Sequence, residues 1–221
     1  MSYDNLSQKG GVAMPKQTFF NLPVEKQTRL LEAAHHEFSR RGFNEASINQ
    51  IIKEAGVSRG SFYQYFEDKH DLYQYFARKL GENLEAAQKA ILPLAGQDLF
   101  SYYQKSFTLM LEDFYLGENR EFYRTMIANR DYRLLSKDEH HQNIEKRLQE
   151  VYDSLSEEKY RFESYGDFRL FNIILEGAVF RIIGGKLSHD EVTAEKISQI
   201  EAQITKVLTW FQDGVLKTER K

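Results

Sequence analysis

The sequence predicts an all-α protein of about nine helices, in which a small N-terminal three-helix unit precedes a larger helical domain. Apolar residues recur every three or four positions through most of the chain, which is the spacing of one helix face. Glycine and proline are rare, at 13 and 3 of 221 residues, so few positions interrupt a helix. No segment alternates apolar and polar residues between hairpin turn signals, as a surface strand would.

Composition excludes several classes of protein. The hydrophobic share of 41% and the charged share of 29% are typical of a soluble globular chain. The sequence has no cysteine, which rules out disulfides, thiolate nucleophiles and cysteine-ligated zinc. No apolar run approaches the ~18–20 residues needed to cross a bilayer, and the first residues lack the apolar stretch of a secretory signal. We therefore expect a cytoplasmic protein with no membrane partner.

The N-terminal part of the chain contains a tail and a first helix. Residues 1–22 are expected to be a flexible tail, because they carry Gly10 and Gly11 among polar residues without periodicity. A helix is expected to open at Pro23 and to end at Gly42. Its apolar face consists of Leu30, Leu31, Ala34 and Phe38.

Three further helices each follow a residue whose side chain can cap a helix N-terminus. Gly56 separates the first two of these helices, and Pro93 ends the third, which is long. The boundaries divide the chain into a compact unit over residues 23–68 and a larger domain over residues 69–221. The predicted capping residues are Ser47, Ser58 and Asp68.

The two short helices between Ser47 and Phe66 form a helix-turn-helix with a hydrophobic wedge between its helices. The wedge consists of Ile48, Ile51, Ile52, Val57, Phe62 and Phe66. The outer face of the second helix is polar and rich in small and aromatic residues, which suits a helix that lies in the major groove of DNA. This outer face consists of Arg59, Gly60, Ser61, Tyr63, Gln64 and Tyr65.

Individual residues of this face have a chemical role available. Arg59 can donate two hydrogen bonds to guanine O6 and N7, an interaction worth roughly 1–3 kcal/mol of discrimination. Gly60 permits close approach of the backbone, at a cost of ~1 kcal/mol in helix propensity relative to alanine. Tyr63 and Lys69 are placed to bind phosphates. The net charge of −3 means that positive charge would have to gather on one face.

The run VSRGSFYQYFEDKHDLY, from Val57 to Tyr73, resembles the signature of the TetR/AcrR family over residues 24–76. The resemblance implies a homodimer that binds a palindromic double-stranded operator and releases it when a small-molecule effector enters the C-terminal domain. Repression is likewise implied by the resemblance. It also implies a DNA-contacting surface made of Ser47, Ser58, Arg59, Gly60, Ser61, Tyr63, Gln64, Tyr65 and Lys69. The alternative is that Tyr63, Tyr65 and Phe66 are core aromatics and Arg59 is a solvated charge.

The C-terminal domain is expected to hold helices near 97–116, 118–135, 137–156, 166–187 and 193–217. The last two carry apolar stripes and small residues that suit a four-helix dimer interface. The alternative is that both stripes are buried within one chain. The predicted interface residues are Phe168, Leu175, Ala178, Val179, Ile182, Ile200, Ile204, Val207, Leu208 and Phe211.

Bulky apolar residues of the same domain suit a hydrophobic or aromatic effector. Each of them could instead be plain core. The candidates are Phe107, Met110, Leu111, Phe114, Phe122, Met126, Phe171 and Ile174. A polar cluster over residues 130–133 could orient a polar end of the ligand or lie on a helix surface. We expect the helix from Lys69 to Leu92 to act as the lever between effector and DNA, with Leu80 and Leu84 as its coupling residues.

The competing interpretation is a helical-bundle protein that binds metal or haem. Asp138, His141 and Glu145 share one helical face, but a di-metal site needs such a motif on two helices, and a solvated face is favoured. The pairs His35-His36 and His140-His141 could ligate haem. Gly184-Gly185-Lys186 lacks the other residues of a phosphate loop. We expect no enzyme activity, cofactor or metal; an adaptor that merely reuses the fold is a further alternative.

Overall fold

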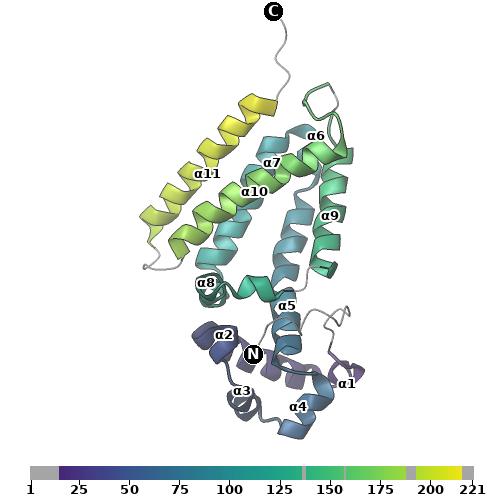
Figure 1. Ribbon diagram of the computed structural model, residues 1–221, viewed down its shortest axis with the longest axis vertical. Coiled ribbons are helices and arrows are strands. Elements are labelled where there is room, and N and C mark those ends of the chain that lie inside the picture. The colour runs from purple at the N-terminus through teal and green to yellow at the C-terminus, as the bar shows by residue number, and fades with distance from the viewer. Residues whose placement is uncertain (1–14, 136–137, 157, 188–192, 216–221) are drawn as a thin grey trace, which may run out of the picture.

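The computed structural model describes residues 15–135, 138–156, 158–187 and 193–215, with the side chains of 136–143, 186–192 and 215 outside this description. Within these ranges the chain is helical and contains no strand, as predicted. Figure 1 shows a small head, formed by α1 to α4, at one end of a longer helical body, with α5 leading from one to the other. None of the helices described is both long and apolar enough to span a bilayer.

The head is built from α1 (Gln17–Phe20), α2 (Val24–Glu45), α3 (Ile48–Ala55) and α4 (Arg59–Tyr65). The predicted caps of α4 and α5 are confirmed. Ser58 Oγ accepts a hydrogen bond from the Ser61 N–H at 3.1 Å, and Asp68 Oδ1 accepts one from the Asp71 N–H at 2.9 Å. Gly56 ends α3 in the left-handed conformation, with a φ of 66°.

One prediction for the head is wrong. The tail does not extend to residue 22, because residues 15–22 are part of the fold and the Phe19 side chain is 0% exposed. Residues 1–14 of the predicted tail lie outside the described residues. The predicted break at Gly42 is confirmed: the backbone leaves the helical conformation there, with a φ of 69° and a ψ of 179°, and a short further turn to Glu45 completes α2.

The predicted wedge forms the core of the head. The side chains of Ile51, Phe62 and Phe66 are fully buried, and Ile48, Ile52 and Val57 pack against them with part of their surface exposed. Leu30, Ala34 and Phe38 of α2 close the other side of this core. Because the buried residues of α4 all lie on one side, its opposite side faces outward.

The body begins with α5 (Lys69–Ala90) and continues through α6 (Pro93–Gln97) and α7 (Leu99–Leu111), with η2 (Glu112–Leu116) extending α7. It then contains α8 (Arg120–Asn129), η3 (Asp131–Leu134), α9 (Asp138–Asp153), α10 (Tyr165–Leu187) and α11 (Ala194–Val215). The two last helices lie side by side along one flank (Figure 1). These bounds agree with the predicted helical stretches to within a few residues, except over 118–135. There α8 ends at Asn129, Arg130 is in the left-handed conformation with a φ of 60°, and η3 follows as a separate turn. The short helices α1 and α6 are additions.

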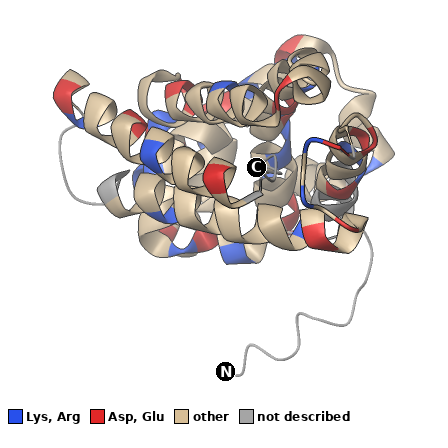
Figure 2. Cartoon of the chain, turned by 90° about the horizontal axis from the view of Figure 1, so that it is seen from above, with Lys and Arg blue, Asp and Glu red and all other residues tan. Residues whose placement is uncertain are grey.

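Positions of both charge signs occur along the helices of the body. Figure 2 looks at the body from the end that lies away from the head and shows Lys and Arg as well as Asp and Glu on the same helices.

The turn between α8 and η3 is docked onto the head. Asp131, 2% exposed, accepts a hydrogen bond from the Phe43 N–H at 2.8 Å, next to the kink at Gly42. Thr125 Oγ1 donates to the Ser39 carbonyl at 2.6 Å, and the Leu134 carbonyl accepts from Gln74 Nε2 at 3.1 Å. The body therefore contacts the head through this turn as well as through α5.

Candidate nucleic-acid interface

The outward side of α4 is the most exposed functional surface of the head. Arg59, Gly60, Tyr63 and Gln64 are exposed, and Ser61 and Tyr65 are partly buried. The Tyr65 ring leans towards the core, with its centroid 6.4 Å from that of Phe19. Helix α4 therefore has an exposed face of four residues, flanked by the side chains of Ser61 and Tyr65. A helix of this size can enter the major groove of DNA.

Arg59 is held in place by its neighbours. Its Nη1 atom donates to Asn49 Oδ1 at 2.7 Å, and its Nη2 atom donates to the Tyr63 hydroxyl at 3.3 Å. The guanidinium carbon lies 5.7 Å from the centre of the Tyr63 ring. Sequence reasoning missed Asn49, because only the packing of α3 against α4 brings it beside Arg59.

A shallow, open cleft of about 240 Å³ lies beside Arg59. The first turn of α3 forms one wall, and helix N-termini present unpaired backbone N–H groups and a positive dipole end. Arg59 and Lys69 supply two cations. A cleft with these donors can hold a backbone phosphate. The lining residues are Ala46, Ser47, Ile48, Asn49, Arg59 and Lys69.

Two residues of this cleft differ in detail from the predictions. Ser47 is the N-cap residue of α3, but its side chain accepts no capping hydrogen bond. Its N–H instead donates to Glu37 Oε1 at 2.9 Å. Lys69 Nζ donates to the carbonyls of Asn44 and Ala46 at 3.1 and 2.9 Å, and burial lowers the pKa of this ammonium group. Lys69 thus clamps the turn between α2 and α3.

The sequence matches two family models that together cover both parts of the chain. Residues 30–76 match bacterial regulatory proteins of the tetR family, and residues 98–215 match the tetracyclin repressor-like C-terminal domain. The chain belongs to the TetR family. The predicted family and the predicted all-α fold with an N-terminal helix-turn-helix are therefore confirmed.

Individual relatives agree with this assignment. YdgC of Bacillus subtilis, an uncharacterized HTH-type transcriptional regulator, is 35% identical over 109 residues, or 42% of this chain and 55% of that protein. An HTH-type regulator of Staphylococcus aureus is 30% identical over 121 residues, or 41% and 65%. The chain thus spans less than two thirds of the length of these TetR relatives.

Solved structures share the fold. A putative TetR-family regulator from Mesorhizobium loti superposes with a TM-score of 0.64 at 16% identity, covering 89% of this chain and 100% of that one. SmeT, in a complex with triclosan, has a TM-score of 0.55 at 16% identity, covering 89% and 94%. At these identities the likeness concerns the fold.

The predicted effector residues are not all gathered in one place. Phe122 packs between Tyr73 and Phe76 at the junction with the head, with ring centroids 5.7 and 5.0 Å away. Phe107 and Phe171 instead both pack against Tyr103 higher in the body. The prediction is wrong for Ile174, which is 53% exposed on the outside of α10. The remaining candidates are buried or partly buried: Met110, Leu111, Phe114 and Met126.

Buried polar groups that the sequence did not single out lie in the same body. Gln88 Nε2 donates to Ser106 Oγ at 2.9 Å, and Arg147 Nη1 donates to the side-chain oxygen Oε1 of Gln88. Burial raises the pKa of the nearby Glu176 carboxyl, and the charge of Arg147 opposes this shift. The predicted polar cluster has another role, because Asp131 binds the head and residues 130, 132 and 133 are exposed.

The predicted dimer residues are mostly core. Phe168, Leu175, Val179, Ile200, Ile204 and Leu208 are buried within the chain, so the prediction is wrong for these six. Ala178, Ile182, Val207 and Phe211 are partly buried. Other apolar side chains of the same two helices face outward instead: Leu170, Ile173, Ile174, Phe180 and Trp210.

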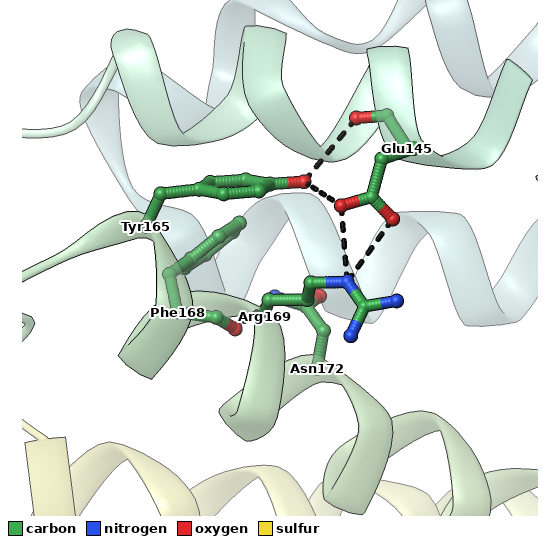
Figure 3. Close-up of polar contacts among 5 residues, drawn as sticks. All are labelled: Glu145, Tyr165, Phe168, Arg169 and Asn172. Carbon is green, nitrogen blue, oxygen red and sulfur yellow. Dashed lines mark hydrogen bonds and ion pairs between the residues drawn. The ribbon is translucent and has the colours of Figure 1, made fainter. Parts of the chain in front are cut away.

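The helical face of Asp138, His141 and Glu145, which the competing interpretation would use for metal, can be followed at Glu145. Its carboxylate accepts from Arg169 Nε at 3.0 and 3.1 Å and from the Tyr165 hydroxyl at 2.7 Å (Figure 3). This carboxylate joins α9 to α10. The side chains of Asp138, His140 and His141 lie outside the described residues. Of the other pair, His36 contacts Glu54 at 2.5 Å, and the His35 ring packs on Phe76.

Proposed function

We propose that this TetR-family chain is a ligand-responsive repressor that binds a palindromic operator as a homodimer and leaves it when a small apolar molecule enters the body. The observation that carries the proposal is the exposed face of α4, where Arg59 stands beside a cleft suited to phosphate. Arg59 would read guanine in the major groove. The cleft between α3 and α4 would bind the adjoining phosphate and fix the register.

Dimerisation would use the outward face of α10 and α11. Leu170, Ile173 and Ile174 are 57%, 53% and 53% exposed on α10, and Trp210 is 62% exposed on α11. Exposed apolar residues gathered on neighbouring helices are typical of a protein interface. A two-fold pairing of this face would hold two copies of α4 at the spacing of about 34–36 Å that adjacent major grooves require.

The effector would enter the aromatic body between α5, α7 and α10. Phe107 and Phe171 would contact its apolar part, and Gln88 and Arg147 would orient a polar end. The fold neighbour SmeT is in a complex with triclosan, which supports a compact aromatic ligand as the first class to test. No cofactor is part of the proposal.

The signal would travel by two routes from body to head. One is α5, where Leu80 and Leu84 pack against the core, so that a ligand could tilt the helix. The other is the α8–η3 turn, where Asp131 holds the kink of α2. A ligand that moves either element would change the distance between the two copies of α4 in the dimer. A change of a few ångströms would prevent both copies from contacting the operator at the same time.

Selection of bound fragments from a random duplex library tests the proposal. We expect enrichment of one palindromic sequence, followed by release when an apolar aromatic compound from a screening collection is added. Binding should weaken as salt rises, because phosphate contacts release counterions. Recovery of no preferred sequence, with retention of a protein partner instead, would favour an adaptor and contradict the proposal.

A further inference from the structure

Helix α4, the proposed recognition helix, is short. The backbone carbonyls at its C-terminal end need hydrogen-bond partners. A seven-residue helix is marginal on its own, because nucleation fixes several residues before the hydrogen bonds accumulate. The last carbonyls of any helix also lack partners within the helix. Many helices solve this with a glycine in the left-handed conformation. In α4, the residue after the helix is Phe66, in an extended conformation.

Residues 16–18 supply the missing partners. The Lys16 N–H donates to the Tyr65 carbonyl at 2.8 Å, and Lys16 Nζ donates to the Tyr63 carbonyl at 2.9 Å. The Thr18 hydroxyl donates to the Gln64 carbonyl. Three successive carbonyls at the end of α4 are therefore satisfied from one distant segment, and the Lys16 ammonium also complements the negative end of the helix dipole.

Phe19 fastens this segment to the core. Its side chain is 0% exposed, and its ring centroid lies 5.1 Å from that of Phe66 and 5.4 Å from that of Tyr75. Phe66 follows α4 directly, and Tyr75 lies on α5. The segment is thereby anchored at the point where α4 meets the helix that leads to the body.

We propose that Lys16–Phe20 is a positioning element for operator recognition, which holds α4 in the orientation that DNA reading requires. The inference rests on the proposed function of α4. With its terminal carbonyls paired, α4 keeps one orientation before DNA arrives, and binding does not have to order it. Without the brace, the last turn of α4, which carries Tyr63 and Gln64, loosens while the phosphate cleft at its other end stays intact.

Thr18→Val tests this element, because it removes the hydroxyl and keeps the shape of an exposed side chain. We expect binding to the selected operator to weaken about 3- to 10-fold, the loss of one hydrogen bond's contribution. Binding to a scrambled duplex and the salt dependence should not change, because the phosphate contacts remain. Thr18→Ser, which retains the hydroxyl, should restore operator binding to within about twofold of the parent.

Two further variants keep the test decisive. Thr108→Val removes a hydroxyl that donates to the Gln104 carbonyl within α7 of the body, and should leave operator binding unchanged. Lys16→Gln removes the ammonium from the Tyr63 carbonyl and should act like Thr18→Val on the operator-to-scrambled ratio. Fluorescence anisotropy gives the affinities, and the melting temperature confirms folding.

The outcomes separate this inference from the proposed function. If the parent chain binds no duplex selectively, the proposed function fails. The positioning role is overturned if the parent chain binds the operator selectively but Thr18→Val and Lys16→Gln change the ratio of operator to scrambled-duplex affinity by less than twofold. A parallel loss of operator and scrambled binding would also overturn it, because that would indicate general loss of the head.

Discussion

Glu37 shows how a single buried side chain organises the reading surface. Its carboxylate accepts from Arg40 Nη2 at 2.8 Å and from the Ser47 N–H at 2.9 Å, at the start of α3. Burial by itself would raise the pKa of this carboxyl, but these two hydrogen bonds and the charges of Arg40 and Arg41 hold it below its usual value. The charged carboxylate thus pairs the backbone N–H of Ser47, the residue that precedes α3.

Glu37→Gln should therefore destabilise the protein in a pH-dependent way. A carboxyl whose folded pKa is lowered stabilises the fold above its unfolded pKa, near 4.5, and loses this contribution as pH falls through the folded pKa. We expect the variant to lose about 1–3 kcal/mol of unfolding free energy at pH 7. The deficit should shrink below pH 4.5, whereas the exposed Glu32→Gln control should show little deficit. Urea unfolding at several pH values checks this, and a deficit independent of pH would contradict it.

Residue predictions succeeded where the chemistry is local. Ser58 and Asp68 cap helices because each needs only the N–H three residues later, and Gly56 ends α3 by its own conformation. Asn49 could not be found in this way, since its partner Arg59 lies on another helix.

The α8–η3 turn links the body and the head through side-chain contacts, in addition to the continuous helix α5. Its Asp131 carboxylate is buried and binds the backbone of Phe43, where α2 has just kinked at Gly42. A buried N–H without a partner costs about 1–3 kcal/mol. The contact therefore fixes how the end of α2 sits, and α3 follows α2 directly.

Asp131→Ala should loosen this joint. We expect a loss of about 1–3 kcal/mol in unfolding free energy and faster hydrogen exchange at the Phe43 amide, because that N–H loses its acceptor. Exchange in α11 should be unchanged. Arg133 is exposed and lies on the same turn, so Arg133→Ala should leave hydrogen exchange at the Phe43 amide unchanged. Unaltered exchange at Phe43 in Asp131→Ala would show that the carboxylate does not hold the joint.

For whole helices, the sequence predicted where each helix begins and ends better than it predicted which side of the helix is buried. The bounds of α10 and α11 follow their apolar spacing, but α10 carries large apolar residues around most of its circumference. Periodicity could not tell that Leu175 faces the core and Ile173 faces outward. The four residues of α1 are too few for any periodicity, and what holds them is the buried ring of Phe19 together with hydrogen bonds from Lys16 and Thr18 to α4.

The whole molecule is proposed to act only as a pair. Ile173→Glu places a charge in the middle of the outward face of α10, where desolvating it on association would be costly. We expect the variant to sediment as a monomer at concentrations where the parent is a dimer, with its helix content unchanged. Leu116→Glu alters an apolar side chain that is 63% exposed on η2, outside α10 and α11, and should remain dimeric. A dimeric Ile173→Glu would place the interface elsewhere.

The central claim is that α4 reads bases through Arg59, and the ratio of operator to scrambled-duplex affinity tests it most directly. The measurement compares the parent chain with Arg59→Ala at two salt concentrations. We predict that the variant loses roughly 1–3 kcal/mol of discrimination, or about 5- to 150-fold in the ratio, as expected for a bidentate contact to guanine. If Arg59→Ala discriminates as well as the parent chain, α4 does not read the operator through this residue.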